Sequence, residues 1–163
     1  MGKAQGMAQA VGLLELAGIP LGYLIANEVS KNTVVDLYLA DPVCPGSFLL
    51  IIAGDAANVA IAMEVAKRLG KDHIPSQGML ASIDAAVLRA LASPRGFSGD
   101  KALGIVETSG IAPGILAADG AVKTAQVELM ELRIAGGMGG KALVCFAGEI
   151  DAVQMALDHI QEL

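Results

Sequence analysis

The feature that most restricts the fold of this chain is an internal repeat. The stretch QAVGLLELAGIPLG, which begins at Gln9, aligns with KALGIVETSGIAPG, which begins at Lys101, at a separation of 92 residues. After the next loop the separation becomes 94 residues, and FLLIIAGDAANV from Phe48 aligns with ALVCFAGEIDAV from Ala142. A two-residue insertion in one loop of otherwise matching halves indicates a duplication. We therefore expect two similar small domains in tandem.

Each half has the pattern of a strand, a helix, a strand, a loop, a strand and a helix. Ala10–Leu16 and Phe48–Ala53 are short apolar runs typical of buried strands, and Val34–Ala40 is predicted to be a third strand. Pro20 suits the first turn of the first helix, and Asp55 stands where the N-cap of the second helix belongs. Two helices against one face of a small antiparallel sheet, twice over, predict an α+β fold.

The pattern also suggests where the domains begin and end. We expect a first domain over residues 1–72, a connector over residues 73–100 and a second domain over residues 101–163. The connector contains Pro75, Gly78, Pro94 and Gly96, with room for one short helix near Ile83–Leu91.

Composition excludes several classes of function. The net charge is −6 with 11 Lys and Arg residues and no basic run, which argues against a nucleic-acid partner. The longest apolar run, Phe48–Ala53, is far too short to span a membrane, and the N-terminus does not resemble a secretory signal. Cys44 and Cys145 make no disulfide framework, so a cytoplasmic location is expected. Hydrophobic residues make up 54% of the chain, which indicates that subunits bury apolar surface against one another.

ALGIVETSGIAPGILAADGAVKTAQVEL followed by GGMGGKALVCFAGEIDAV resembles the BMC domain, the building block of bacterial microcompartment shells, and the first half resembles it more loosely. The resemblance implies two tandem ferredoxin-like BMC domains in a homotrimer that mimics a hexamer. Such a pseudohexamer would be a structural tile rather than an enzyme, and it would contact other shell proteins edge to edge. Lys31 and Lys123 stand where the family places its edge lysine; the alternative is two solvated lysines at helix ends.

The family also lines a central pore with the loop between the second and third strands. In the first half this loop carries a Cys-Pro-Gly sequence, which is similar to a tandem shell protein type of propanediol-utilising compartments. There the resemblance implies a [4Fe–4S] cluster on the threefold axis, held by Cys44 of each chain and carrying electrons to or from encapsulated redox enzymes. Three soft thiolates at one point suit an iron–sulfur cluster. The expected pore-lining residues are Pro42, Val43, Cys44, Pro45, Gly46 and Ser47 in the first half and Gly136, Gly137, Met138, Gly139 and Gly140 in the second.

Other interpretations stay open at this point. The tile could lack a cluster and conduct small metabolites through its pore. A function of another class is a small redox enzyme or metabolite sensor that uses Cys44, although no acid–base pair or cofactor motif supports it. The loop with Gly140 and Lys141 departs from a phosphate-binding loop at both ends. We expect Glu15 and Glu107 to be structural and Cys145 to lie in the core.

Overall fold

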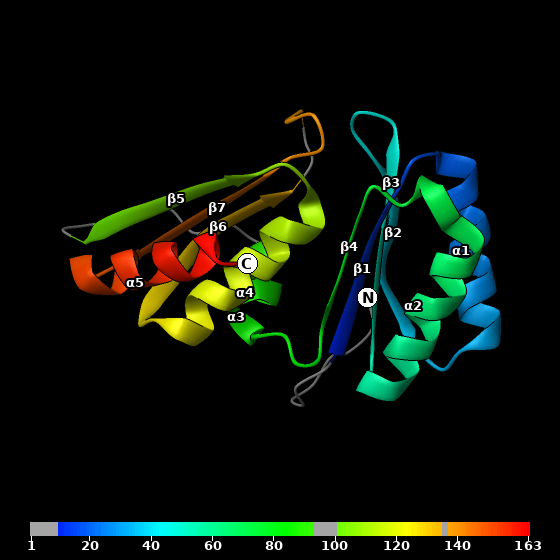
Figure 1. Ribbon diagram of the computed structural model, residues 1–163, viewed down its shortest axis with the longest axis horizontal. Coiled ribbons are helices and arrows are strands. Elements are labelled where there is room, and N and C mark those ends of the chain that lie inside the picture. The colour runs from blue at the N-terminus through cyan, green and yellow to red at the C-terminus, as the bar shows by residue number, and fades with distance from the viewer. Residues whose placement is uncertain (1–9, 93–100, 135–136) are drawn as a thin grey trace. The chain divides into compact units, whose positions relative to one another are not determined.

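The computed structural model describes residues 10–92, 101–134 and 137–163, which form two compact units divided between Ile83 and Asp84. Figure 1 shows the same arrangement in each unit, a small sheet with helices on one face. The elements of the first unit are β1 (Ala10–Leu16), α1 (Ile19–Asn32), β2 (Asp36–Val43), β3 (Ser47–Gly54), α2 (Ala56–Gly70), a short 3-10 helix (Lys71–His73) and β4 (Ser76–Leu80). Its antiparallel sheet has the strand order β2-β3-β1-β4.

The second unit repeats this arrangement except at the two edges of its sheet. Its elements are α3 (Ala85–Ala92), β5 (Ala102–Thr108), α4 (Ile111–Thr124), β6 (Val127–Ile134), β7 (Ala142–Gly148) and α5 (Ile150–Gln161). Among its described residues the sheet has three strands in the order β5-β7-β6, and no counterpart of β4 pairs with β5. The additional helix α3 packs against β6. The sequence prediction of two α+β domains, with antiparallel sheets and helices on one face, is confirmed.

The duplication extends to irregular details of the backbone. The pairing of β2 with β3 shifts register between Leu37 and Leu39, and the pairing of β6 with β7 shifts between Leu129 and Glu131. These positions are equivalent in the two halves. The same local irregularity therefore occurs at the same place in β2 and in β6.

A glycine lets α1 in the first unit, and the equivalent α4 in the second, touch the sheet. In the first unit a Cβ atom on Gly22 would lie 2.1 Å from Cγ of Phe48, a fully buried residue of β3. In the second unit a Cβ atom on the equivalent Gly114 would lie 2.3 Å from Cβ of Ala142. Both contacts join residues that the repeat alignment makes equivalent. Close packing of helix on strand therefore explains why this glycine occurs in both halves.

The structure differs from the sequence prediction at several boundaries. β2 begins at Asp36 and runs through Pro42 to Val43, so it lies later in the chain than the expected strand Val34–Ala40. The segment expected as a connector contains β4, which pairs with β1 and completes the first sheet. The helix expected there is present as α3, and it belongs to the compact second unit. None of the helices in the described ranges has the length and apolarity that crossing a membrane requires.

The predicted N-cap of α2 is confirmed. Asp55 accepts a hydrogen bond at Oδ1 from the backbone N–H of Asn58, with a donor–acceptor distance of 3.0 Å. This bond, together with the side-chain amide of Asn58, lowers the pKa of Asp55 below its ordinary value of 3.8. The cap therefore stabilises the folded protein in its ionised form.

Replacing Asp55 with alanine is expected to lower the melting temperature by a few degrees at neutral pH. Because the folded-state pKa is lowered, the difference between the two proteins is present above pH 3.8 and disappears as the pH falls through the lowered value. Thermal unfolding followed by circular dichroism between pH 2.5 and 7 measures it. The matched control is Glu149→Ala, since Glu149 is the N-cap of α5 but makes no side-chain cap hydrogen bond. An equal loss in both variants would contradict this explanation.

Candidate functional site

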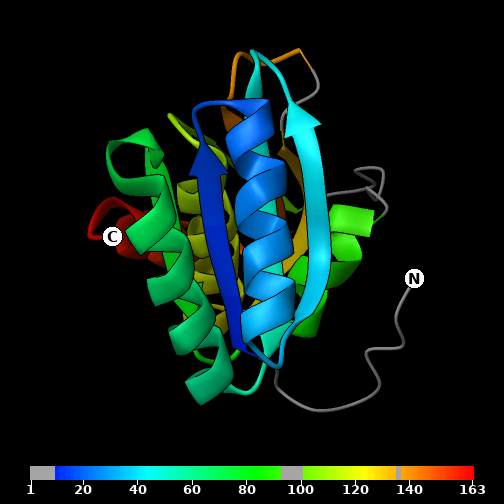
Figure 2. The same cartoon turned by 90° about the vertical axis from the view of Figure 1, so that its right-hand side faces the viewer.

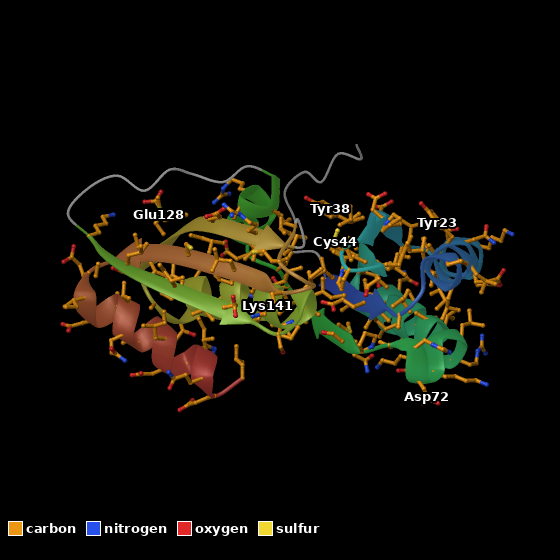
Figure 3. The ribbon with its side chains drawn as sticks, turned by 90° about the horizontal axis from the view of Figure 1, so that it is seen from above. Tyr23, Tyr38, Cys44, Asp72, Glu128 and Lys141 are labelled. Carbon is orange, nitrogen blue, oxygen red and sulfur yellow. The ribbon has the colours of Figure 1, made fainter. Side chains whose placement is uncertain are left out.

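The hairpin between β2 and β3 presents the first candidate site. Val43 ends β2 and Ser47 begins β3, so Cys44, Pro45 and Gly46 form the turn. The backbone N–H of Gly46 donates to the carbonyl of Val43 at 2.9 Å, and the Cys44–Pro45 peptide bond is cis. Gly46 has a φ of 108°, which side chains with a Cβ atom rarely adopt. Cys44 is exposed and free, and Figure 3 shows it on the hairpin.

The equivalent hairpin between β6 and β7 has a different character. Gly137, Gly139 and Gly140 all have positive φ values, and the backbone N–H of Lys141 donates to the carbonyl of Met138 at 3.3 Å. This path depends on glycine, because it repeats a conformation that other residues rarely adopt. The predicted pore residue Gly136 lies outside the described residues. The hairpin carries no thiol, so the two equivalent turns of one chain offer different chemistry.

Two side chains beside this second hairpin are already engaged. Lys141 Nζ lies 2.6 Å from Oε1 of Glu107 on β5, which forms an exposed ion pair. Glu15, the equivalent of Glu107, is buried in β1. The two glutamates therefore have different surroundings, and Lys141 is paired with a carboxylate of its own unit.

A single chain does not assemble a metal site from its described residues. No group of three His, Cys, Asp or Glu side chains comes together within the described ranges. Cys145 lies partly buried on β7, where burial raises the pKa of its thiol and the nearby Glu131 raises it further. This favours the protonated thiol, which is a poor metal ligand. His73 is exposed, and His159 is half-buried against Gly120.

The two predicted edge lysines have different partners. Both lie in the last turn of their helices, α1 and α4. Lys123 Nζ lies 2.5 Å from Oδ2 of the buried Asp119, whereas Lys31 is exposed and no ion pair of it occurs among the described residues. Sequence reasoning missed Asp119, although its spacing of four residues before Lys123 was a signal for such a pair. The edge role of both lysines remains a prediction.

Comparison with known proteins identifies the family. Residues 10–83 and 102–163 both match the BMC domain. The chain belongs to the BMC-domain family. Its two BMC domains correspond to the two halves of the sequence repeat and to the two sheets of the structure.

The relatives of this tandem BMC-domain chain are proteins of microcompartments. It is 36% identical over 156 residues to the bacterial microcompartment shell protein PduT of Citrobacter freundii, covering 96% of this chain and 85% of PduT. A microcompartment protein of Desulfitobacterium hafniense is 35% identical, with a TM-score of 0.81 over 96% of this chain and 87% of the other. Two proteins of the RMM microcompartment, a fused permuted hexameric shell protein and a double-ringed trimeric shell protein, share the fold at 21% and 15% identity. Their TM-scores are 0.75 and 0.76, over 99% of this chain and 86% and 84% of theirs.

Proposed function

We propose that this BMC-domain protein is a structural tile of a bacterial microcompartment shell in the cytoplasm, which works as a homotrimer and not as an enzyme. The observation that carries the trimer is an apolar face on β5. On this face Leu103 and Ile105 are 42% and 57% exposed, and β5 is an edge strand of its sheet. Exposed apolar side chains on an edge strand are available to a further copy of the chain.

The number of copies follows from the repeat. Solved relatives of the same fold are named as hexameric and trimeric shell proteins. A chain with two BMC domains builds a ring of six domains from three copies, each using its bare β5 face against the next chain. Such a ring is a heterologous contact that closes. Its rim would meet other shell proteins, and of the two edge lysines Lys31 is the one with no ion pair among the described residues.

Replacing Ile105 with aspartate is expected to convert the trimer into monomers, because it places a charge in the centre of the buried contact. Sedimentation velocity at micromolar concentration distinguishes the two masses. The control is Met155→Asp, an equally exposed apolar residue on α5 of the same unit, which is expected to leave the trimer intact. A monomeric unmodified protein, or a trimeric Ile105→Asp variant, would overturn the trimer.

The Cys44 hairpins of such a trimer would hold a [4Fe–4S] cluster. The support is chemical: Cys44 is exposed and free at a hairpin tip, and one chain lacks other ligands near it among the described residues. Threefold symmetry supplies three thiols, which suit iron–sulfur binding, and the fourth iron would take water or another ligand. A bound cluster would supply one-electron transfer across the shell, with encapsulated redox enzymes as partners.

Iron and acid-labile sulfide analysis of anaerobically purified protein tests whether the Cys44 hairpins hold the cluster. About four irons and four sulfides per three chains are expected. Absence of both after reconstitution would leave the central hairpins as a pore for small metabolites and would not affect the tile. Turnover of a substrate by the isolated protein would favour the Cys-dependent enzyme or sensor instead.

A further inference from the structure

We propose that Asp119 couples the charged group of Lys123 to the docking of α3, so that a partner that draws this charge away from Asp119 loosens the helix. Asp119 lies on α4 and is only 2% exposed. A carboxylate in such a place is costly unless hydrogen bonds or a positive charge compensate it. Two segments supply the compensating groups, the start of α3 and the last turn of α4.

The two oxygens of Asp119 have different partners. Oδ1 accepts a hydrogen bond from the backbone N–H of Asp84 at 2.7 Å, and Oδ2 lies 2.5 Å from Nζ of Lys123. Asp84 stands just before α3, and its own Oδ1 accepts a hydrogen bond from the backbone N–H of Ala86 at 2.7 Å. One buried carboxylate therefore joins an ammonium group on α4 to the residue that caps α3.

α3 depends on this attachment because the helix is short. It has eight residues, and a helix of that length is marginal in water without tertiary contacts. Within the second unit it packs on β6 and beside α4, where Val87 and Ala90 are buried (Figure 1). An element with so few buried apolar residues opens at a low free-energy cost, so a weaker polar anchor is expected to raise the rate of opening.

The first unit indicates that the carboxylate serves α3. The position equivalent to Asp119 is Asn27 on α1, and the lysine four residues later is kept as Lys31. α1 packs on its own sheet with a neutral amide at this position, so the packing of helix on sheet does not require a charge there. The role that remains for the charge of Asp119 is to hold the N–H of Asp84 and the ammonium group of Lys123 together.

Lys123 is the accessible half of the pair. Its side chain is 43% exposed, whereas Asp119 is buried, so a partner reaches the cation and not the carboxylate. A group that binds the ammonium in place of Asp119 leaves a buried charge uncompensated, and by linkage the docking of α3 then weakens. The inference rests on the proposed function only in naming this partner as an anionic group on a neighbouring shell protein, because Lys123 is a predicted edge residue. The coupling itself is a property of one chain.

Hydrogen–deuterium exchange of the whole protein, followed by mass spectrometry at pH 7, tests the coupling. Lys123→Gln removes the charge, and it is expected to speed exchange of the α3 amides at least about tenfold. Lys123→Arg keeps a charge and is expected to stay within about threefold of the unmodified protein. The matched control is Lys67→Gln, since Lys67 is 42% exposed and pairs with Glu64 on α2, and it is expected to leave α3 unchanged. The amides of β1 report whether a variant is folded.

A double variant separates the coupling from a general loss of stability. Asp119→Asn keeps an acceptor for the N–H of Asp84 and leaves no buried charge. Asp119→Asn combined with Lys123→Gln is therefore expected to exchange more slowly at α3 than Lys123→Gln alone. Additive acceleration in the double variant, or no effect of Lys123→Gln, would overturn the proposal. A chain that stays monomeric while α3 responds to Lys123→Gln would overturn the proposed trimer and support the coupling.

Discussion

Replacing Cys44 with alanine is expected to remove all iron and sulfide from the anaerobically purified protein, together with its brown colour. The reason is that Cys44 is the only thiol of the described residues that is both free and exposed. Without it, the three hairpins of a trimer offer no soft ligand, and no other group of three metal-ligating side chains exists in the described ranges. The variant is expected to stay trimeric, since the alanine removes an exposed sulfur and not a packed one.

Cys145→Ala is the matched control for that experiment. Burial raises the pKa of Cys145, so its thiol stays protonated and its loss should leave the iron content unchanged. Measuring iron, sulfide and mass on the same samples separates loss of the cluster from loss of the trimer. Iron retained in Cys44→Ala, or lost in Cys145→Ala alone, would refute the assignment of Cys44.

The second large effect is expected from Gly22→Ala. A methyl group at this position would meet three atoms of the Phe48 side chain, the nearest at 2.1 Å, so α1 has to move away from β3. Alanine is the better helix former by about 1 kcal/mol, but overpacking a core costs about 1–3 kcal/mol or more, and here the obstacle is a fully buried ring. We expect a net loss of about 2 kcal/mol in the free energy of unfolding. Urea unfolding followed by circular dichroism measures it.

Two further variants test the cause of this loss. Gly120→Ala places its methyl group 3.1 Å from the ring of His159, a side chain that can shift, so helix propensity should make it neutral or slightly stabilising. Phe48→Ala alone is expected to cost about 3–5 kcal/mol through the cavity it leaves. Combined with Gly22→Ala it should cost less than the sum, because the clash is gone. Additive losses would indicate that Gly22 acts through something other than Phe48.

The repeat predicted much of this fold because its elements depend on local patterns. Ala10–Leu16 is a strand with the predicted bounds, and Asp55 caps the helix it was expected to cap. β4 was missed since SQGML has neither a strong apolar run nor alternation, and it becomes a strand only by pairing with β1. Long-range pairing of that kind leaves no local signal.

The candidate site, like the fold, could be predicted from the sequence only in part. The Cys-Pro-Gly sequence placed Cys44 in a turn, and the structure has it there, because proline and glycine act on their own backbone. The bare face of β5 could not be predicted, because an apolar residue such as Leu103 gives no local signal of whether another part of the protein covers it. Burial of Asp119 likewise depends on α3, which comes from another part of the chain.

The placement of α3 has a consequence for how this protein can be divided. The helix follows the first BMC domain in sequence but is folded into the second unit, where the buried Asp119 accepts a hydrogen bond from the backbone N–H of Asp84, the residue just before the helix. If the gene is divided where the second sequence repeat begins, before Lys101, the second fragment lacks the helix that packs on β6. The first fragment then ends in an apolar segment that has lost its packing partner. A cut between Leu80 and Asp84 respects both cores. The boundary of the compact unit is therefore offset from the boundary of the sequence repeat, and fusions or split versions should be designed at the boundary of the compact unit.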